Sequence, residues 1–145
     1  MSSDSPYQML KWARSLAIYN CSKVHIMSNA LKNLSELEDV KFVSIGSLSL
    51  AERSLDWDSG LNWKPDSGIK ISIYNSTVEK IESYAIRGFI HEIVIDSSVV
   101  NVLKSYAVSN INNMNDIMII NSTINQIETQ AFKKFNLDKL HVKMC

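Results

Sequence analysis

The sequence has little of what usually fixes the class of a small protein. Two prolines and four glycines in 145 residues leave little room for flexible linkers. Its 15 basic and 15 acidic residues give no net charge, whereas phosphate contacts normally demand a basic excess in nucleic-acid-binding proteins. No apolar run approaches the roughly 18 residues of a membrane-spanning helix. We therefore expect no nucleic-acid partner and no membrane span in this chain.

Signals of catalysis and of metal binding are also scarce. Two cysteines cannot make a zinc site without more ligands, and no phosphate-binding loop or nucleophile motif occurs. The three histidines lie in different parts of the chain, with no carboxylate at a recurring offset: His25, His91 and His141. We predict a protein that is not an enzyme and has no catalytic residue, cofactor or metal.

What the sequence does contain is a core and a repeat. Apolar residues make up 46% of the chain and charged residues 21%, which suits a single folded domain spanning residues 1–145. The stretch "ISIYNSTVEKIESYA" (71–85) returns as "IMIINSTINQIETQA" (117–131), with "IVIDSSVVNVLKSYA" (93–107) between them. The second apolar residue of each "IxI" recurs at intervals of 24, 31, 22, 24 and 23 residues: Ile18, Phe42, Ile73, Ile95, Ile119 and Val142. This period predicts about five and a half repeats over 13–145.

Each unit changes its hydrophobic period partway along. If units are counted from residues 13, 37, 68, 90, 114 and 137, positions 4 and 6 alternate as in a half-buried strand. From position 11 the apolar spacing becomes three to four residues, which favours a helical turn or an irregular return segment. One strand per unit cannot bury its apolar side alone, so stacked units must form a solenoid with a parallel sheet. Residues 70–74, 92–96 and 116–120 are its predicted neighbouring strands.

The segment "MNDIMIINSTINQIETQAFKKF" (114–135) resembles the extracellular type of leucine-rich repeat, LxxLxLxxNxIxxIxxxAFxxL. The resemblance implies a parallel sheet on a concave face, short helical or irregular convex segments, and a protein-recognition role. Position 9, usually Asn or Cys, holds serine in three units, and the cysteine-rich caps of secreted members are missing. The alternative is a right-handed parallel β-helix, which also shows "IxIxNS" patterns but normally has three strands in each turn. The stretch "VEKIESYAIRGF" is rich in helix formers and favours the leucine-rich repeat.

Two further segments complete the predicted domain. Residues 1–12 are expected to cap the first unit, with Ser5 and Pro6 at the start of a short helix. Residues 56–67, rich in Gly, Asp, Ser and Pro, are expected to form an insertion loop. Cys21 and Cys145 hold the same position five strand spacings apart, about 24 Å, which is too far for a disulfide. We expect both to be free thiols.

The predicted binding surface is the outward side of the strands, at positions 3, 5 and 7. Tyrosine and aliphatic side chains lie there among charges of both signs, a composition typical of protein-binding patches. Strand propensity alone also favours such residues. The residues predicted to bind a protein or peptide are Tyr19, Lys41, Val43, Lys70, Tyr74, Val94, Asp96, Met118, Ile120 and His141. Two alternatives stay open: a homodimer through the sheet or the open C-terminal edge, and an enzyme using Glu92, Asp96 and Asp116.

Location depends on the glycosylation sequons. Four match N-x-[ST], at Asn20, Asn33, Asn75 and Asn121, and three of them share position 8 just after a strand. Asn is also common in turns for conformational reasons. The first ten residues lack the pattern of a signal peptide. We predict an extracellular or cell-surface protein that has lost its signal peptide, with a cytoplasmic protein as the alternative.

Overall fold

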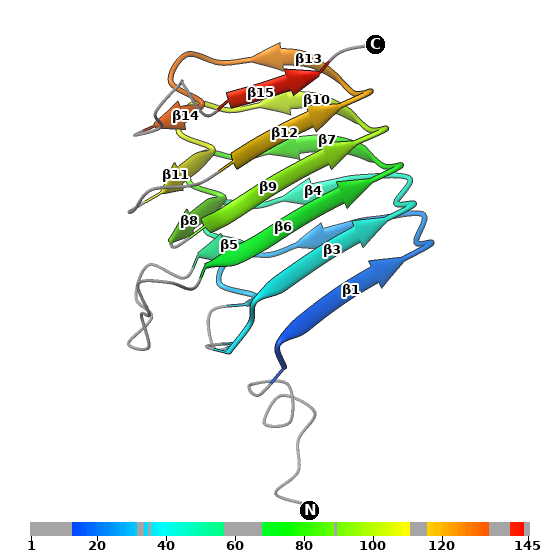
Figure 1. Cartoon of the computed structure of the whole chain (residues 1–145), viewed down its shortest axis with the longest axis vertical. Helices are drawn as coiled ribbons and strands as arrows, with labels where there is room; N and C mark the ends of the chain where they lie inside the picture. Colours follow the sequence, from blue (N-terminus) through cyan, green and yellow to red (C-terminus); the bar gives the residue numbers. More distant parts are fainter. Residues whose placement is uncertain are drawn as a thin grey trace, which may run out of the picture.

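The computed structural model is a solenoid of parallel strands (Figure 1). It describes residues 13–31, 34, 36–56, 68–88, 90–110, 116–133 and 140–143, with the backbone alone at 110, 116, 132, 133 and 140–143. Each turn of the solenoid is here called a coil, and in the described residues the four middle coils have a strand in each of three sheets. Strands of the front sheet run to the right in Figure 1 and those behind it run to the left while the chain climbs, so the coil is right-handed.

Sheet A, at the front of Figure 1, is the longest stack. It has the order β1 (Ser15–Tyr19), β3 (Asp39–Val43), β6 (Ile69–Tyr74), β9 (Ile90–Asp96), β12 (Asp116–Ile120) and β15 (Leu140–Lys143). All five pairings are parallel, and the register aligns Ile71 with Ile93 and Ile93 with Ile117. The prediction that 70–74, 92–96 and 116–120 are neighbouring parallel strands is therefore confirmed, because equal repeats place equal residues in register.

The rest of each coil corrects the predicted fold class. Sheet B contains β2 (Val24–Ile26), β4 (Leu48–Leu50), β7 (Thr77–Ile81), β10 (Val99–Leu103) and β13 (Thr123–Ile127). Sheet C contains β5 (Leu55–Asp56), β8 (Ile86–Gly88), β11 (Val108–Asn110) and β14 (Phe132–Lys133). The expected helical convex segments are wrong, since the described residues contain no helix. Three strands per turn fit the alternative, a right-handed parallel β-helix.

The helical spacing of the return segment has another cause. In β7, Val78 and Ile81 point into the core, and the two residues between them, Glu79 and Lys80, are both exposed. The pairing of β7 with β10 joins positions 10, 11, 13 and 14 and omits position 12, where Glu79 lies. An extra outward residue in a strand produces an i, i+3 apolar spacing that mimics one helical turn.

The two N-terminal coils lack this extra residue. β4 has simple alternation, with Leu48 and Leu50 buried, and its pairing with β7 shifts register between Leu48 and Ser49. β2 follows the same three-residue pattern with Val24 and Ile26. Val24 is at position 12 of its unit, whereas the equivalent apolar residue of the later units is at position 11. This difference reflects the shorter strand of the N-terminal coils.

A single column of apolar side chains fills the solenoid. The inward residues of the three sheets form one cluster, and its members at positions 4 and 6 of β3 and β6 are 0–1% exposed: Val40, Phe42, Ile71 and Ile73. No coil could bury these residues alone, so each depends on its neighbours for burial. The core lies between the sheets and leaves the outer faces available for other roles.

Two corners of every coil have a left-handed backbone. At position 8, between sheets A and B, φ lies between 47° and 58° at Asn20, Ser44, Asn75, Ser97 and Asn121. At position 17, between sheets B and C, φ lies between 58° and 61° at Asn29, Arg53, Tyr84, Tyr106 and Gln130. Asn adopts this conformation more readily than most residues, which explains its recurrence at position 8.

A ladder of serine hydroxyls follows the first corner. The backbone N–H of Ser76 donates to Oγ of Ser98 at 3.1 Å, and that of Ser98 donates to Oγ of Ser122 at 3.0 Å. Each hydroxyl in turn donates to the carbonyl two residues before it. These serines are 3–8% exposed inside the turn, and the ladder satisfies amides that would otherwise be buried without partners. Cys21, a free and partly buried thiol, holds the same position in the first coil.

Several predicted segments lie outside the described residues. They are the capping segment 1–12, Asn33, Cys145 and residues 57–67 of the insertion loop. The first residue assigned to that loop, Asp56, belongs to β5.

Candidate functional site

Nine of the ten predicted binding residues lie on one surface, the outer face of sheet A. Here "the sheet A face" means the outward side chains of β1, β3, β6, β9 and β12, at positions 3, 5 and 7. They point outward because positions 4 and 6 of the same strands enter the core. Parallel pairing in register places equal positions of neighbouring coils side by side in three columns. The strands and outward positions that the repeat predicts are therefore those of the structure.

The middle of the sheet A face is less accessible than the sequence predicts. Ser72 is 0% exposed and Val94 is 4% exposed, although both are at the outward position 5. Small side chains in a central column are covered by longer neighbours on both sides and along the same strand. Val94 lies outside the core cluster, so it is buried by the outer face itself. Val94 was predicted to be an exposed contact residue, and this is corrected: its side chain lies beneath the surface of the sheet A face, here called the floor of that face.

Two interactions between neighbouring strands cover this floor. Lys41 of β3 reaches across to Tyr74 of β6, with its Nζ 5.9 Å from the centre of the ring. Lys70 of β6 forms an ion pair with Glu92 of β9 at 3.3 Å. Both pairs join adjacent coils, so they fix the lateral spacing of the side chains around Ser72.

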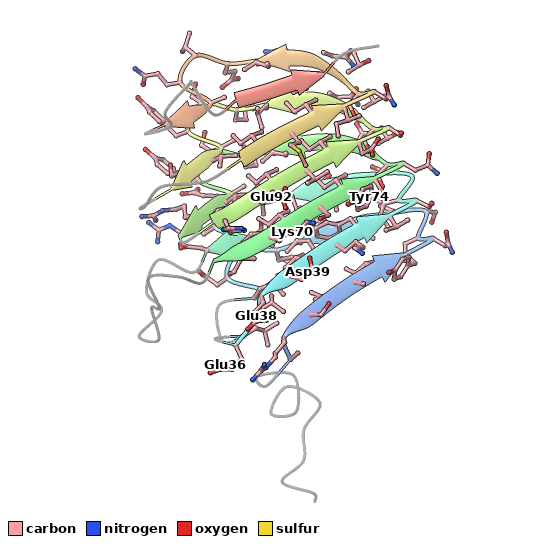
Figure 2. The ribbon with its side chains drawn as sticks, viewed as in Figure 1. Glu36, Glu38, Asp39, Lys70, Tyr74 and Glu92 are labelled. Atoms are coloured by element: carbon pink, nitrogen blue, oxygen red, sulfur yellow. The ribbon has the colours of Figure 1, made fainter. Side chains whose placement is uncertain are left out.

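Two oxygens on this face have no hydrogen-bond partner. They are Oδ1 of Asp39 and Oγ of Ser72, and both atoms are buried. Figure 2 shows Asp39, Lys70 and Glu92 rising across three neighbouring strands, with Tyr74 farther along β6 and Glu36 and Glu38 near the start of β3. Lys70 bonds to Glu92, so the carboxylate of Asp39 remains the under-satisfied charge in this row.

The other predicted residues extend the face in both directions. Tyr19 is 53% exposed at the first strand, while Val43, Asp96, Met118 and Ile120 are partly exposed. His141 lies opposite Met118 in the register of β15, and its side chain is outside the described part.

Of the acids considered for catalysis, Asp116 is aligned with Glu92, and Asp96 accepts a hydrogen bond from Ser97.

Side-chain ladders on the other faces were not predicted. At position 17 the rings of Tyr84 and Tyr106 stack with centroids 5.6 Å apart, and the hydroxyl of Tyr106 bonds to Gln130. At position 12 the amide of Asn125 donates to Asn101 at 2.8 Å, and that of Asn101 donates to Glu79 at 3.3 Å. The repetition of related residue types at these positions was the available signal, since equal positions of parallel coils are in contact.

One carboxylate has a shifted pKa. The backbone N–H of Ser105 donates to Oε2 of Glu128 at 2.9 Å, and this bond is the main cause that lowers the pKa of Glu128. Nζ of Lys104, 3.2 Å from Oε1, lowers it further. The three residues join the coils of β10 and β13, so this is a structural clamp between coils.

The exposed corner asparagines Asn20, Asn75 and Asn121 carry three of the sequons. The amide of Asn75 bonds to the hydroxyl of Ser44 at 3.3 Å. The left-handed corner supplies a conformational reason for these asparagines that is independent of glycosylation. Their modification stays a prediction.

Within the described residues, no group of three His, Cys, Asp or Glu side chains is arranged to hold a metal ion. Those residues also include no helix long and apolar enough to cross a membrane. No protein-family model, curated protein or solved structure matches this chain. The resemblance to leucine-rich repeats therefore depends on the residue pattern alone.

Proposed function

We propose that this chain is a non-enzymatic recognition domain that binds a protein or peptide partner through the sheet A face. The observation that carries the proposal is the pair of buried oxygens, Asp39 Oδ1 and Ser72 Oγ, that lack hydrogen-bond partners. A buried oxygen without a partner costs roughly 1–3 kcal/mol, so a ligand that displaces the covering side chains and donates to this oxygen gains that amount back. Both oxygens lie on the same face, in adjacent strands.

The surroundings of these oxygens favour a polypeptide as the ligand. Tyr19 and Tyr74 supply aromatic area, and Met118 and Ile120 supply flexible and branched apolar area on the same face. Aromatic anchors inside a polar rim are typical of protein interfaces. The carboxylate of Asp39 beside Glu36 and Glu38 suits a basic side chain of the partner (Figure 2).

Peptide selection tests the proposal without knowledge of the natural partner. A random peptide library displayed on phage is selected against the immobilised chain, and the affinity of a selected peptide is measured by calorimetry. We expect Tyr74→Ala to weaken binding by at least about fivefold, or roughly 1 kcal/mol. Asp39→Asn should weaken peptides that contain a basic residue, because it removes the charge and keeps the shape.

The matched control is Val99→Ala, since Val99 is 38% exposed on the outer face of sheet B. It should leave the affinity unchanged. Binding that survives both Tyr74→Ala and Asp39→Asn would exclude the sheet A face, as would a selection that yields no binder. The segment with Trp57 and Trp63 would then be tested next.

An extracellular or cell-surface location belongs to the same proposal. It is supported by the exposure of Asn20, Asn75 and Asn121 at the corners. Expression with a signal peptide in a eukaryotic secretory cell, followed by glycosidase treatment, should reduce the mass of the secreted chain. An unchanged mass would remove this support and favour a cytoplasmic protein.

A further inference from the structure

Asp39 lies between two lysines whose charged ends are held by other groups. Lys41 follows it by two residues on the same side of β3, and Lys70 is aligned with it in β6. Nζ of Lys41 lies 5.9 Å from the centre of the Tyr74 ring, and Nζ of Lys70 lies 3.3 Å from Oε2 of Glu92. Among the described residues, Oδ1 of Asp39 has no hydrogen-bond partner. The two neighbouring cations therefore leave this oxygen unsatisfied.

Ser72 brings a second unsatisfied oxygen to the same place. It follows Lys70 by two residues on the outward side of β6, so its Cα lies about 8 Å from that of Asp39, given the strand spacing and the rise per residue. The side chain is 0% exposed, and its Oγ has no hydrogen-bond partner in the part of the chain that the structure describes. Each of two adjacent strands thus supplies one buried acceptor to the sheet A face.

The charges around these oxygens favour a positively charged ligand group. Figure 2 shows Asp39, Lys70 and Glu92 in three neighbouring strands, with Glu36 and Glu38 near the start of β3. The single charge of Lys70 is matched by Glu92, so the charge of Asp39 has no counterpart in this row. A charged group with an unpaired, buried oxygen is unfavourable, and a cation from a ligand would supply the missing partner.

We propose that Asp39 and Ser72 form a binding site for the guanidinium group of an arginine side chain. Tyr74 and Glu92 act as positioning residues that keep the site free of the protein's own cations. A guanidinium donates through a planar fork of five N–H groups, so it can bond both oxygens at once. It is more weakly hydrated than an ammonium, which lowers the cost of entering a buried site. The inference rests on the proposed function of the sheet A face and names the partner residue that anchors there.

The two lysines explain how a covered site can admit a ligand. Lys41 is aligned with Ser72, and Lys70 with Asp39, so their side chains are the long neighbours of the two oxygens. A lysine side chain has a flexible stem of four carbons. The stems can therefore move aside for an arginine while the charged ends keep their partners. If the end of Lys70 is released, it should instead close the site by pairing with Asp39.

Titration with small ligands tests the site directly. The chain is titrated with N-acetyl-arginine amide, and backbone amide signals are followed by NMR. The matched ligands are the lysine amide and the citrulline amide, and citrulline keeps the shape of arginine without its charge. We expect arginine to bind at least about fivefold more tightly than either. Asp39→Asn should remove the preference over citrulline, and Ser72→Ala should narrow the preference over lysine. Circular dichroism checks that both variants are folded.

A second set of variants tests the positioning role of Glu92. Glu92→Gln should weaken arginine binding by about threefold or more, because it releases Lys70 to pair with Asp39. Adding Lys70→Met to this variant should restore the affinity. The matched control is Glu82→Gln, which releases Lys80 from an ion pair of 3.0 Å away from the sheet A face. It should leave the affinity for arginine unchanged.

A double-mutant cycle detects the same release without any ligand. Asp39→Asn and Lys70→Met are combined, and the free energy of unfolding is measured in urea for each variant. The coupling between the two residues should be close to zero in the parent chain and stabilising in the Glu92→Gln background. A purely long-range effect of the lost charge on ligand binding would create no such coupling.

The outcomes separate this inference from the proposed function. Selected peptides whose binding depends on Tyr74, but in which citrulline replaces arginine without loss, would refute the arginine site and leave the proposed function intact. Binding of N-acetyl-arginine amide at Asp39, together with a failed peptide selection, would do the reverse. A parent chain without preference for arginine over citrulline, or a Glu92→Gln variant that binds arginine as the parent does, would overturn the proposal.

Discussion

The hydroxyl of Ser98 links two coils: it accepts the backbone N–H of Ser76 at 3.1 Å and donates to the carbonyl of Asp96 at 2.9 Å. Ser98 is 3% exposed, so water cannot readily replace these bonds. The ladder therefore contributes to stability mainly through what its loss would leave unpaired.

Ser98→Ala should lower the free energy of unfolding by about 1–3 kcal/mol, since it leaves the buried N–H of Ser76 without a partner. Urea titration followed by circular dichroism measures the change. Ser49→Ala is the control, because Ser49 is a half-buried residue on the outer face of β4. Equal losses from the two variants would show that the ladder contributes nothing specific.

Substitutions at Asn75 should follow backbone strain. Its φ is 48°, a conformation that costs most L-residues roughly 1–2 kcal/mol. Asn75→Val should be less stable than Asn75→Gly by about that amount or more, because a β-branched residue is especially poor there. Thermal unfolding of the two variants gives the comparison. A valine variant as stable as the glycine variant would contradict the left-handed corner.

Alanine substitutions at three residues of one coil should lower the stability by different amounts. Ile95→Ala should cost about 2–5 kcal/mol, because Ile95 is 6% exposed in the core cluster. Val94→Ala, on the covered floor of the sheet A face, should cost about 1–2 kcal/mol for its two buried methyl groups. Val99→Ala should be nearly neutral.

The stability loss of Val94→Ala, compared with that of Val99→Ala, tests whether the centre of the sheet A face is covered or open to solvent. If Val94→Ala in a denaturant titration costs no more than Val99→Ala, the floor is open to solvent and the burial of Val94 is wrong.

Acid should weaken the clamp at Glu128. Its pKa is lowered in the folded state, mainly by the N–H of Ser105 and then by Lys104. A lowered folded pKa means that the stabilisation is fully present above the unfolded pKa. It is lost as the pH falls through the folded pKa, so the affected window lies below the usual range of a glutamate.

Lys104→Met should reduce this pH dependence, because it removes one cause of the shift. The unfolding midpoint in urea, measured from neutral pH down into the acid range, should fall less steeply than for the parent chain. Lys80→Met is the matched control, since Lys80 pairs with Glu82 instead, at 3.0 Å. The two lysine variants behaving alike would count against a role for Lys104 in the shift.

The coil and its front sheet could be predicted from the sequence because their signal is strong and local. Alternation at positions 4 and 6 fixes a strand, and a constant period fixes the register between Ile93 and Ile117. These features depend on one unit and its repeat alone.

The second and third strands could not be predicted in the same way. β8 and β11 have three residues each, too few to show an alternating period. In β7 the two successive outward residues Glu79 and Lys80 made a strand look like a helical turn. A distinction between the two readings needs the pairing partners, which lie one coil away in sequence.

Exposure on the candidate site was the other limit. The pattern shows which way Ser72 and Val94 point, and both do face outward. It does not show that neighbouring side chains such as Lys41 and Tyr74 close over the centre of the face. Coverage depends on side-chain lengths in adjacent strands, so it emerges only once the register is known.

The junction from sheet C to sheet A has a further consequence for how this protein can change. β8 ends at Gly88 and β9 begins at Ile90, whereas β5 ends at Asp56 and β6 begins only at Ile69. The strands on both sides of the longer junction keep the same parallel pairing as the rest. Chain length is therefore uncoupled from register at this corner. New segments can be grafted there without disturbing the stack, so evolution or an engineer could diversify this protein at that corner while the scaffold stays constant.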